Sequence, residues 1–341
     1  MGSPLPHSTR FLEQCKASAS SQVQDAPTCI DAEERLRKLM LLLLSLVISA
    51  MLTLVHVRVI DMPHWEGQVL LHRQILEHQA PAPYQFRALQ PILVEALCHL
   101  MGRPATGDAF VAAYALIRLL CIWATLVAVF VWLSAMFSTP GAALGACLVA
   151  MLLPFTYWRY NFQPTSVGEM AGFALALLCA ARRRLGWFVL VCLLGMFNRE
   201  TMIFVPGLWL LWWWRDTRKG ELVVLSATFL VCAALYLAMR HAWPVPEDLN
   251  RHLLVNMQHN VSNGLGNIDV ALMTLPWIAW LLLPSARRMP AHFRRMALVY
   301  VLWVPLHFVC ALWEEVRYYL TAMLPILPAL VWSLFPEARR D

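Results

Sequence analysis

The sequence predicts an all-α, polytopic integral membrane protein with about ten transmembrane helices. Of its 341 residues, 60% are hydrophobic and only 14% are charged, and the mean hydropathy is +0.57. Soluble domains are about half apolar and a quarter charged, so this composition indicates a lipid environment. Apolar runs long enough to cross a hydrocarbon core of ~30 Å recur along the chain. These runs are continuous and Leu-rich, whereas strands of a membrane barrel alternate, so helices are expected.

The chain divides into a long membrane domain with two short tails. Residues 1–34 are polar and rich in Ser, Gln and Pro, which predicts a disordered cytoplasmic tail without the apolar segment of a signal peptide. The membrane domain is expected over 35–337, and 338–341 form a second cytoplasmic tail. The expected spans are 39–58, 108–137, 140–157, 166–181, 185–197, 201–214, 221–239, 269–285, 296–312 and 318–335.

The positions of the basic residues predict that both termini lie in the cytoplasm. Short segments rich in Arg and Lys lie between the apolar runs, and such segments are retained on the cytoplasmic side. The net charge of +6 is therefore an orientation signal, and no soluble basic domain is present that would bind nucleic acid. The basic segments lie at residues 35–38, 182–184, 215–219, 287–295 and 339–340.

Two expected spans, 185–197 and 201–214, are too short to cross a bilayer, since each rises only about 20 Å. The polar residues 198–201 join them. We therefore expect this polar turn to lie at membrane depth, facing protein or water rather than lipid.

The first outer loop, residues 59–107, contains two amphipathic segments that are expected to lie in the membrane interface. Asp61 follows the first span directly, where a partly desolvated carboxylate could act as a general base. The alternative is a carboxylate at a helix end in contact with water.

Four arginines lie in four separate outer segments, and arginine binds phosphate through a planar pair of donors. These residues predict an anionic site, because charges within the membrane are costly and usually functional. The alternative is that each pairs with a carboxylate, as Arg199 could with Glu200 or Glu169, and Arg317 with Glu314. The candidate anion-binding and substrate-binding residues are Arg87, Arg159, Arg199, Arg317, Glu66, Glu169, Asn198, Glu200, Glu314 and Glu315.

Other classes of site have little support. The histidines show no zinc-site spacing such as HExxH, so no metal ligand is assigned. P-loop, GxGxxG and GxSxG motifs are absent, which argues against a nucleotide-driven pump and a hydrolase-fold esterase. The nine cysteines lie mostly in apolar runs and are expected to be small buried side chains.

The pattern resembles the GT-C class of membrane glycosyltransferases, which carry an acidic residue in the first outer loop followed by interfacial helices. Tyr84-Gln85-Phe86-Arg87-Ala88-Leu89-Gln90-Pro91 resembles a Y-x-[YF]-R-x-L-x-P stretch of bacterial membrane proteins of this type. The 198–201 turn and the 315–317 segment belong to the same resemblance. The chain departs from the class in lacking a paired acidic motif in the first loop, where Asp61 and Glu66 are five residues apart.

The resemblance implies an enzyme that transfers a sugar from a polyprenyl-phosphate donor to a saccharide, lipid or protein acceptor at the outer face. Asp61 would be the catalytic base, and Arg87, Arg199 and Arg317 would neutralise the departing lipid phosphate. A divalent cation, Mg²⁺ or Mn²⁺, is compatible with this chemistry but is not required. The short outer loops favour a bacterial inner membrane with a periplasmic active face. The alternatives are a transporter or flippase for an anionic lipid-linked saccharide, and a structural subunit of an envelope complex.

Overall fold

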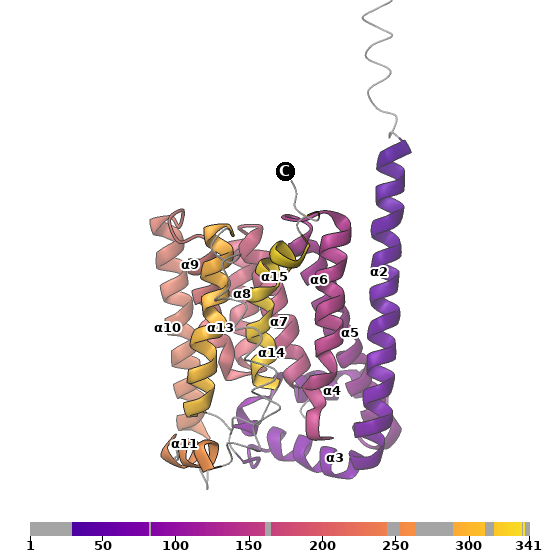
Figure 1. Cartoon of the computed structure of the whole chain (residues 1–341). Helices are drawn as coiled ribbons and strands as arrows, with labels where there is room; N and C mark the ends of the chain where they lie inside the picture. The colour runs from indigo at the N-terminus through magenta and orange to yellow at the C-terminus, as the bar shows by residue number, and fades with distance from the viewer. Residues whose placement is uncertain are drawn as a thin grey trace, which may run out of the picture. The chain divides into compact units, whose positions relative to one another are not determined.

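The protein is helical throughout the part of the chain that the structure describes. The structure is a computed structural model that describes residues 29–81, 83–160, 165–243, 253–262, 289–310, 317–335 and 337, and these ranges contain no strand. Figure 1 shows the succession of helices, which confirms the predicted all-α class.

The elements follow closely from the apolar runs of the sequence. They are α2 (Cys29–His56), η1 (Val57–Asp61), α3 (Met62–Leu76), η2 (Tyr84–Phe86), α4 (Leu89–Leu100), α5 (Gly107–Leu133), α6 (Thr139–Leu152), η3 (Leu153–Tyr160), α7 (Thr165–Ala181), α8 (Leu185–Met196), η4 (Glu200–Phe204), α9 (Val205–Trp212), α10 (Lys219–Ala242), α11 (Leu253–Ser262), α13 (Ala291–Cys310), α14 (Arg317–Met323), η8 (Leu324–Ile326) and α15 (Leu327–Leu334). The expected span at 269–285 and the tail at 338–341 lie outside the described residues.

Within the described residues, four helical segments are long and apolar enough to cross a membrane: Arg35–Leu76, Gly107–Leu133, Thr139–Thr156 and Lys219–Ala242. The remaining apolar helices of the described chain include two short ones, α8 and α9, on either side of the 198–201 turn. The twelve residues of α8 rise only about 18 Å, as the sequence predicted for this pair.

The first helix begins earlier than expected. Residues 29–34 belong to α2, so the predicted disordered tail 1–34 is wrong at its carboxyl end, while residues 1–28 lie outside the described part.

The chain forms two compact units, Met1–Leu44 and Ser45–Asp341, and α2 begins in the first and ends in the second. In the second unit α5 packs against α6 and α7, α8 lies between α7 and α10, and α13 contacts α9 and α11. Figure 1 shows α3 and α4 lying across one end of this bundle.

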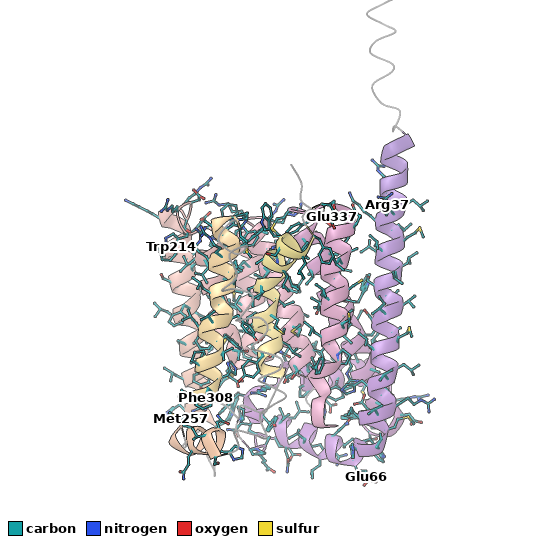
Figure 2. The ribbon with its side chains drawn as sticks, in the orientation of Figure 1. Arg37, Glu66, Trp214, Met257, Phe308 and Glu337 are labelled. Carbon is teal, nitrogen blue, oxygen red and sulfur yellow. The ribbon has the colours of Figure 1, made fainter. Side chains whose placement is uncertain are left out.

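The helix α10 connects two groups of loops at opposite ends of the second unit. At its amino end, Arg183 binds the Glu221 carboxylate with Nε–Oε1 at 2.8 Å, and Arg183 Nη2 donates to the Asp216 carbonyl. At its carboxyl end, the carbonyl of Trp243 accepts from Gln85 Nε2 at 2.9 Å. The 24 residues of α10 separate these contacts by about 36 Å. Figure 2 likewise shows Trp214 and Glu337 at one end, and Glu66 and Met257 at the other.

Candidate functional site

Arg87, between η2 and α4, forms an ion pair with Glu200, the first residue of η4, 113 residues further along the chain. Arg87 Nε donates to Glu200 Oε2 at 3.1 Å, and Nη2 donates to Oε1 at 2.5 Å, so the contact is bidentate. The Arg87 side chain is almost completely buried, whereas 29% of the Glu200 side chain is exposed. The pair therefore presents a carboxylate to the surroundings, with the guanidinium behind it.

A second ion pair lies deeper, between the start of α7 and the turn before η4. Arg199 Nη1 donates to the Glu169 carboxylate and, at 3.3 Å, to the hydroxyl of Ser166. The other Glu169 oxygen accepts from the Thr201 hydroxyl. Arg199 and Glu169 are 0% and 1% exposed. Glu169 is also within electrostatic range of Arg87 and Glu200, so the two ion pairs form one four-charge cluster: Arg87, Glu200, Arg199 and Glu169.

Neutral hydrogen bonds hold the 198–201 turn beside α7 and α4. Asn198 Nδ2 donates to the Thr165 carbonyl at 2.9 Å, and Asn198 Oδ1 accepts from Gln90 Nε2 at 3.1 Å. A backbone bond from the Leu89 amide to the Phe197 carbonyl runs alongside. Gly168 makes this approach possible, because a Cβ there would stand 2.4 Å from Gln90 Nε2 and 2.7 Å from Asn198 Oδ1.

The structure thus brings together five of the predicted site residues: Arg87, Glu169, Asn198, Arg199 and Glu200. The formal charges of the four-charge cluster cancel, since two guanidinium groups face two carboxylates. The sequence analysis gave pairing of Arg199 with a carboxylate as the alternative to an anionic site, and the structure shows this pairing with Glu169. The cluster can bind hydroxyl groups as it stands, and it can bind a phosphate if the anion replaces a carboxylate on an arginine.

Asp61 does not belong to the four-charge cluster and has other partners. Arg118 on α5 donates to both of its oxygens, at 2.6 and 3.3 Å, and His56 Nδ1 lies 3.4 Å from Oδ1. The side chains of Asp61 and Arg118 are 0% and 3% exposed. Asp61 ends the π-helical turn η1, a type of irregularity that is frequent at functional sites. Both oxygens are engaged and buried, so the catalytic role of Asp61 stays a prediction.

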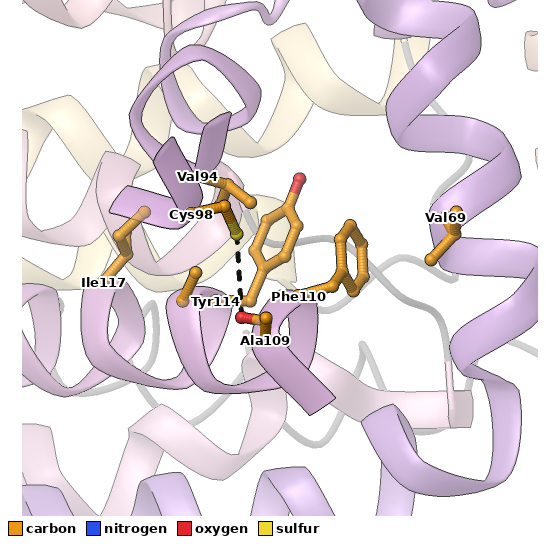
Figure 3. Close-up of a cluster of buried hydrophobic side chains, with 8 residues drawn as sticks. Val69, Val94, Cys98, Ala109, Phe110, Tyr114 and Ile117 are labelled. Atoms are coloured by element: carbon orange, nitrogen blue, oxygen red, sulfur yellow. Dashed lines mark hydrogen bonds between the residues drawn. The ribbon is translucent and has the colours of Figure 1, made fainter. Parts of the chain in front are cut away.

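A chain of polar side chains continues from this ion pair along α3, α4 and α5. Gln68 donates to the Ile60 carbonyl at 3.2 Å. One turn further on, His72 lies 3.0 Å from the Tyr114 hydroxyl through Nδ1 and 2.9 Å from Glu95 Oε1 through Nε2. The His72 ring packs against Phe110 and Tyr114 of the apolar cluster drawn in Figure 3, whereas 49% of the Glu95 side chain is exposed. Sequence reasoning missed these partners; the signal for Arg118 was its charge within an apolar run.

A cavity of about 710 Å³ lies between α5 on one side and α2 and α3 on the other. Its lining is mainly aliphatic, and Asp108 is the charged residue among the described residues that line it. Thr53 faces this cavity and is 7% exposed, and its hydroxyl has no hydrogen-bond partner within the described chain. The lining residues are Ala50, Thr53, Leu54, Val57, Met62, Trp65, Gly107, Asp108, Val111, Ala112, Ala115, Leu116 and Leu119.

Of the predicted site residues outside the four-charge cluster and apart from Asp61 and Asn198, only Glu66 has a described side chain. Glu66 is exposed on α3. Arg159 and Arg317 belong to η3 and α14, and their side chains, like the whole of Glu314 and Glu315, lie outside the described part. The described residues contain no group of three or more His, Cys, Asp or Glu that could hold a metal ion.

Comparison with known proteins adds no relative. No family model matches the sequence, and no curated protein or solved structure is significantly similar to it. The function therefore has to be argued from the arrangement of these residues in a helical chain with several segments able to cross a membrane.

Proposed function

We propose that this protein is a membrane glycosyltransferase that moves a sugar from a polyprenyl-phosphate donor to an acceptor at one membrane face. The observation that carries the proposal is the four-charge cluster. Three separate stretches of the chain, 87–90, 165–169 and 198–201, supply its charges and the amide groups beside it, and it lies where short helices replace full spans. Charged groups at such depth are costly and are usually retained for function.

Arg87 and Glu200 are the reacting centre of the proposed mechanism. The donor phosphate displaces the Glu200 carboxylate from Arg87, which then holds the phosphate through its two parallel donors. The acceptor oxygen forms the bond to the sugar carbon while the bond from that carbon to the phosphate oxygen breaks. The lipid phosphate leaves with the bonding electrons, and the freed Glu200 carboxylate accepts the acceptor proton. Arg199, fixed by Glu169, adds positive charge behind the phosphate as its negative charge develops.

This role departs from the assignment of Asp61 as base, because Glu200 is the more exposed carboxylate. Asp61 instead fixes α5 to the junction of α2 and α3 through Arg118. A divalent cation is compatible with the proposal, but no step of the mechanism needs one.

The proposed topology has about ten spans, both termini in the cytoplasm, and the four-charge cluster facing the periplasm of a bacterial inner membrane. It is supported by the arginine-rich connections 182–184 and 215–219, which meet at the amino end of α10, where Arg183 Nη2 donates to the Asp216 carbonyl. The segments containing Gln85 and His78 meet Trp243 at its other end. This is the alternation that the distribution of basic residues predicts.

A structural subunit of an envelope complex is the second candidate. It is favoured by the cancellation of charge, because Arg87, Arg199 and Arg118 each bind a carboxylate of the same chain. Under this alternative the ion pairs only position helices, and a buried ion pair can be replaced by apolar residues without loss.

The proposal is tested with purified protein in liposomes that contain a polyprenyl-phosphate hexose and a bacterial lipid extract as the source of acceptor, with free polyprenyl phosphate as the readout. Glu200→Gln is expected to reduce its release by about 10²–10⁴-fold, the usual contribution of a general base. Glu221→Gln is the matched control, because Glu221 also accepts two bonds from one arginine but lies at the opposite end of α10. Equal activity of the two variants contradicts the proposed role of Glu200.

A further inference from the structure

Three segments of the second unit are held together at the amino end of α10. Arg183, between α7 and α8, donates through Nη2 to the Asp216 carbonyl, between α9 and α10. Arg295, near the start of α13, donates through Nε to the Leu211 carbonyl at 2.9 Å. Figure 1 shows α9, α10 and α13 reaching the same end of the bundle. We call this group of segments the basic junction; its members are residues 180–187, 211–221 and 289–295.

Positive charge predominates in the basic junction. Its two carboxylates are Asp216 and Glu221, and both oxygens of Glu221 accept hydrogen bonds from Arg183. Six further basic side chains of the basic junction are exposed, and none of them forms an ion pair within the described residues. They are Arg182, Arg184, Arg215, Arg218, Lys219 and Arg294.

The exposed arginines lie next to exposed apolar side chains. Trp187 follows Arg184 by three residues in α8, and Trp214 directly precedes Arg215; the two tryptophans are 66% and 62% exposed. Val223, near the start of α10, is 68% exposed. In a bilayer such apolar side chains contact lipid, and tryptophan favours the level of the head groups. The cations of the basic junction therefore lie where lipid head groups lie.

We propose that the basic junction binds the phosphate groups of anionic phospholipids in the adjacent leaflet. The ligand that fits this surface joins a net negative charge to an apolar chain, because unpaired cations and lipid-facing side chains occur side by side along it. An arginine holds a phosphate through two parallel donors, and several cations near an anionic leaflet add their attractions. A zwitterionic lipid carries its own cation beside the phosphate, so it compensates the positive excess less well.

This surface is separate from the proposed transferase site. It lies at the amino end of α10, whereas the segment containing Gln85 meets α10 at its carboxyl end. The proposal therefore does not rest on the transferase function, and lipid binding can be measured without any sugar donor.

The experiment compares phosphatidylglycerol with phosphatidylcholine in nanodiscs, at equal mole fraction and with the same photoactivatable group in the chain near the head group. Labelled peptides are identified by mass spectrometry. On peptides of the basic junction, labelling by phosphatidylglycerol is expected to exceed labelling by phosphatidylcholine at least about fivefold, the factor that one arginine contributes near an anionic surface. Equal labelling of these peptides by the two lipids overturns the proposal.

A pair of double variants tests the location of the site. Arg184→Gln/Arg215→Gln removes one exposed arginine from each of two segments and is expected to lower the labelling ratio about fivefold. Arg73→Gln/Arg103→Gln is the matched control, because these arginines are also exposed but lie in α3 and after α4. Size-exclusion chromatography checks that both proteins remain folded. A ratio that is unchanged in the first variant, or that falls equally in the control, overturns the proposed site.

Inorganic phosphate distinguishes a lipid site from a site for soluble anions. Millimolar phosphate, added at constant ionic strength, is expected to leave the labelling ratio of the wild-type protein unchanged, because the free anion lacks the chain that holds a head group beside the tryptophans. Loss of the preference for phosphatidylglycerol in phosphate overturns the proposal in favour of a soluble anion.

Discussion

Arg118 on α5 donates to both oxygens of Asp61, and the two side chains are almost completely buried. The pair joins the middle of a long apolar helix to the π-helical turn where α2 gives way to α3. The backbone leaves helical geometry three residues later, at His64 (φ −128°, ψ 17°), so the ion pair anchors the segment just before this kink, and His56 lies 3.4 Å from the same carboxylate.

Removal of the charge of Asp61 alone should destabilise the protein. Asp61→Asn leaves Arg118 buried without its anion, at a cost of about 3–5 kcal/mol. The double variant Asp61→Asn/Arg118→Met should recover most of this loss, because no charge then remains buried. The stability of the single and of the double variant is measured by thermal unfolding in detergent, with size-exclusion chromatography as the readout. A double variant no more stable than Asp61→Asn would show that the ion pair is not the source of the effect.

Gly168 is the position at which a single methyl group should disturb the four-charge cluster. Gly168→Ala places a Cβ against Gln90 and Asn198, and overpacking of this kind costs about 1–3 kcal/mol. Gly186→Ala is the control, since a Cβ there meets nothing within 4 Å and alanine favours a helix by about 1 kcal/mol. The measurement is the unfolding midpoint of each variant. Equal changes of the midpoint in Gly168→Ala and Gly186→Ala would contradict the close packing of Gly168.

The sequence predicts the helices well because their signal is local. Long apolar runs indicate α5 and α10 directly, and the polar residues 198–201 predict the interruption between α8 and η4. Charged and amide side chains in the segments between the apolar runs also predicted Arg87, Asn198, Arg199 and Glu200 as candidate site residues, and the structure brings these four together.

The pairing of these residues could not be predicted in the same way. Arg87 lies 113 positions from Glu200 and Arg118 lies 57 from Asp61, and no spacing in a single sequence encodes such contacts. Asp61 was therefore assigned as a free carboxylate, although a charge within an apolar run, Arg118, was available to bind it. The chain of His72, Tyr114 and Glu95 was missed because each residue alone is an ordinary member of an amphipathic helix.

The two ends of the second unit should lie on opposite sides of the membrane. In a background in which the nine native cysteines are replaced, Glu66→Cys should react with a membrane-impermeant maleimide added outside cells. Trp214→Cys, which replaces a side chain that is 62% exposed at the other end, should react only after permeabilisation. Labelling of both cysteines in intact cells would contradict the proposed topology.

The central claim is that the Arg87–Glu200 ion pair acts in catalysis and not only in folding. The most direct measurement is the release of free polyprenyl phosphate from a polyprenyl-phosphate hexose by Arg87→Met/Glu200→Met, compared with wild-type protein in the same liposomes. The double variant removes both charges together, so it should fold, because replacing an ion pair by apolar residues is often neutral. Our account predicts a folded protein whose release falls by at least about 10²-fold. Release at the wild-type rate by the folded double variant would contradict the account and favour a structural subunit.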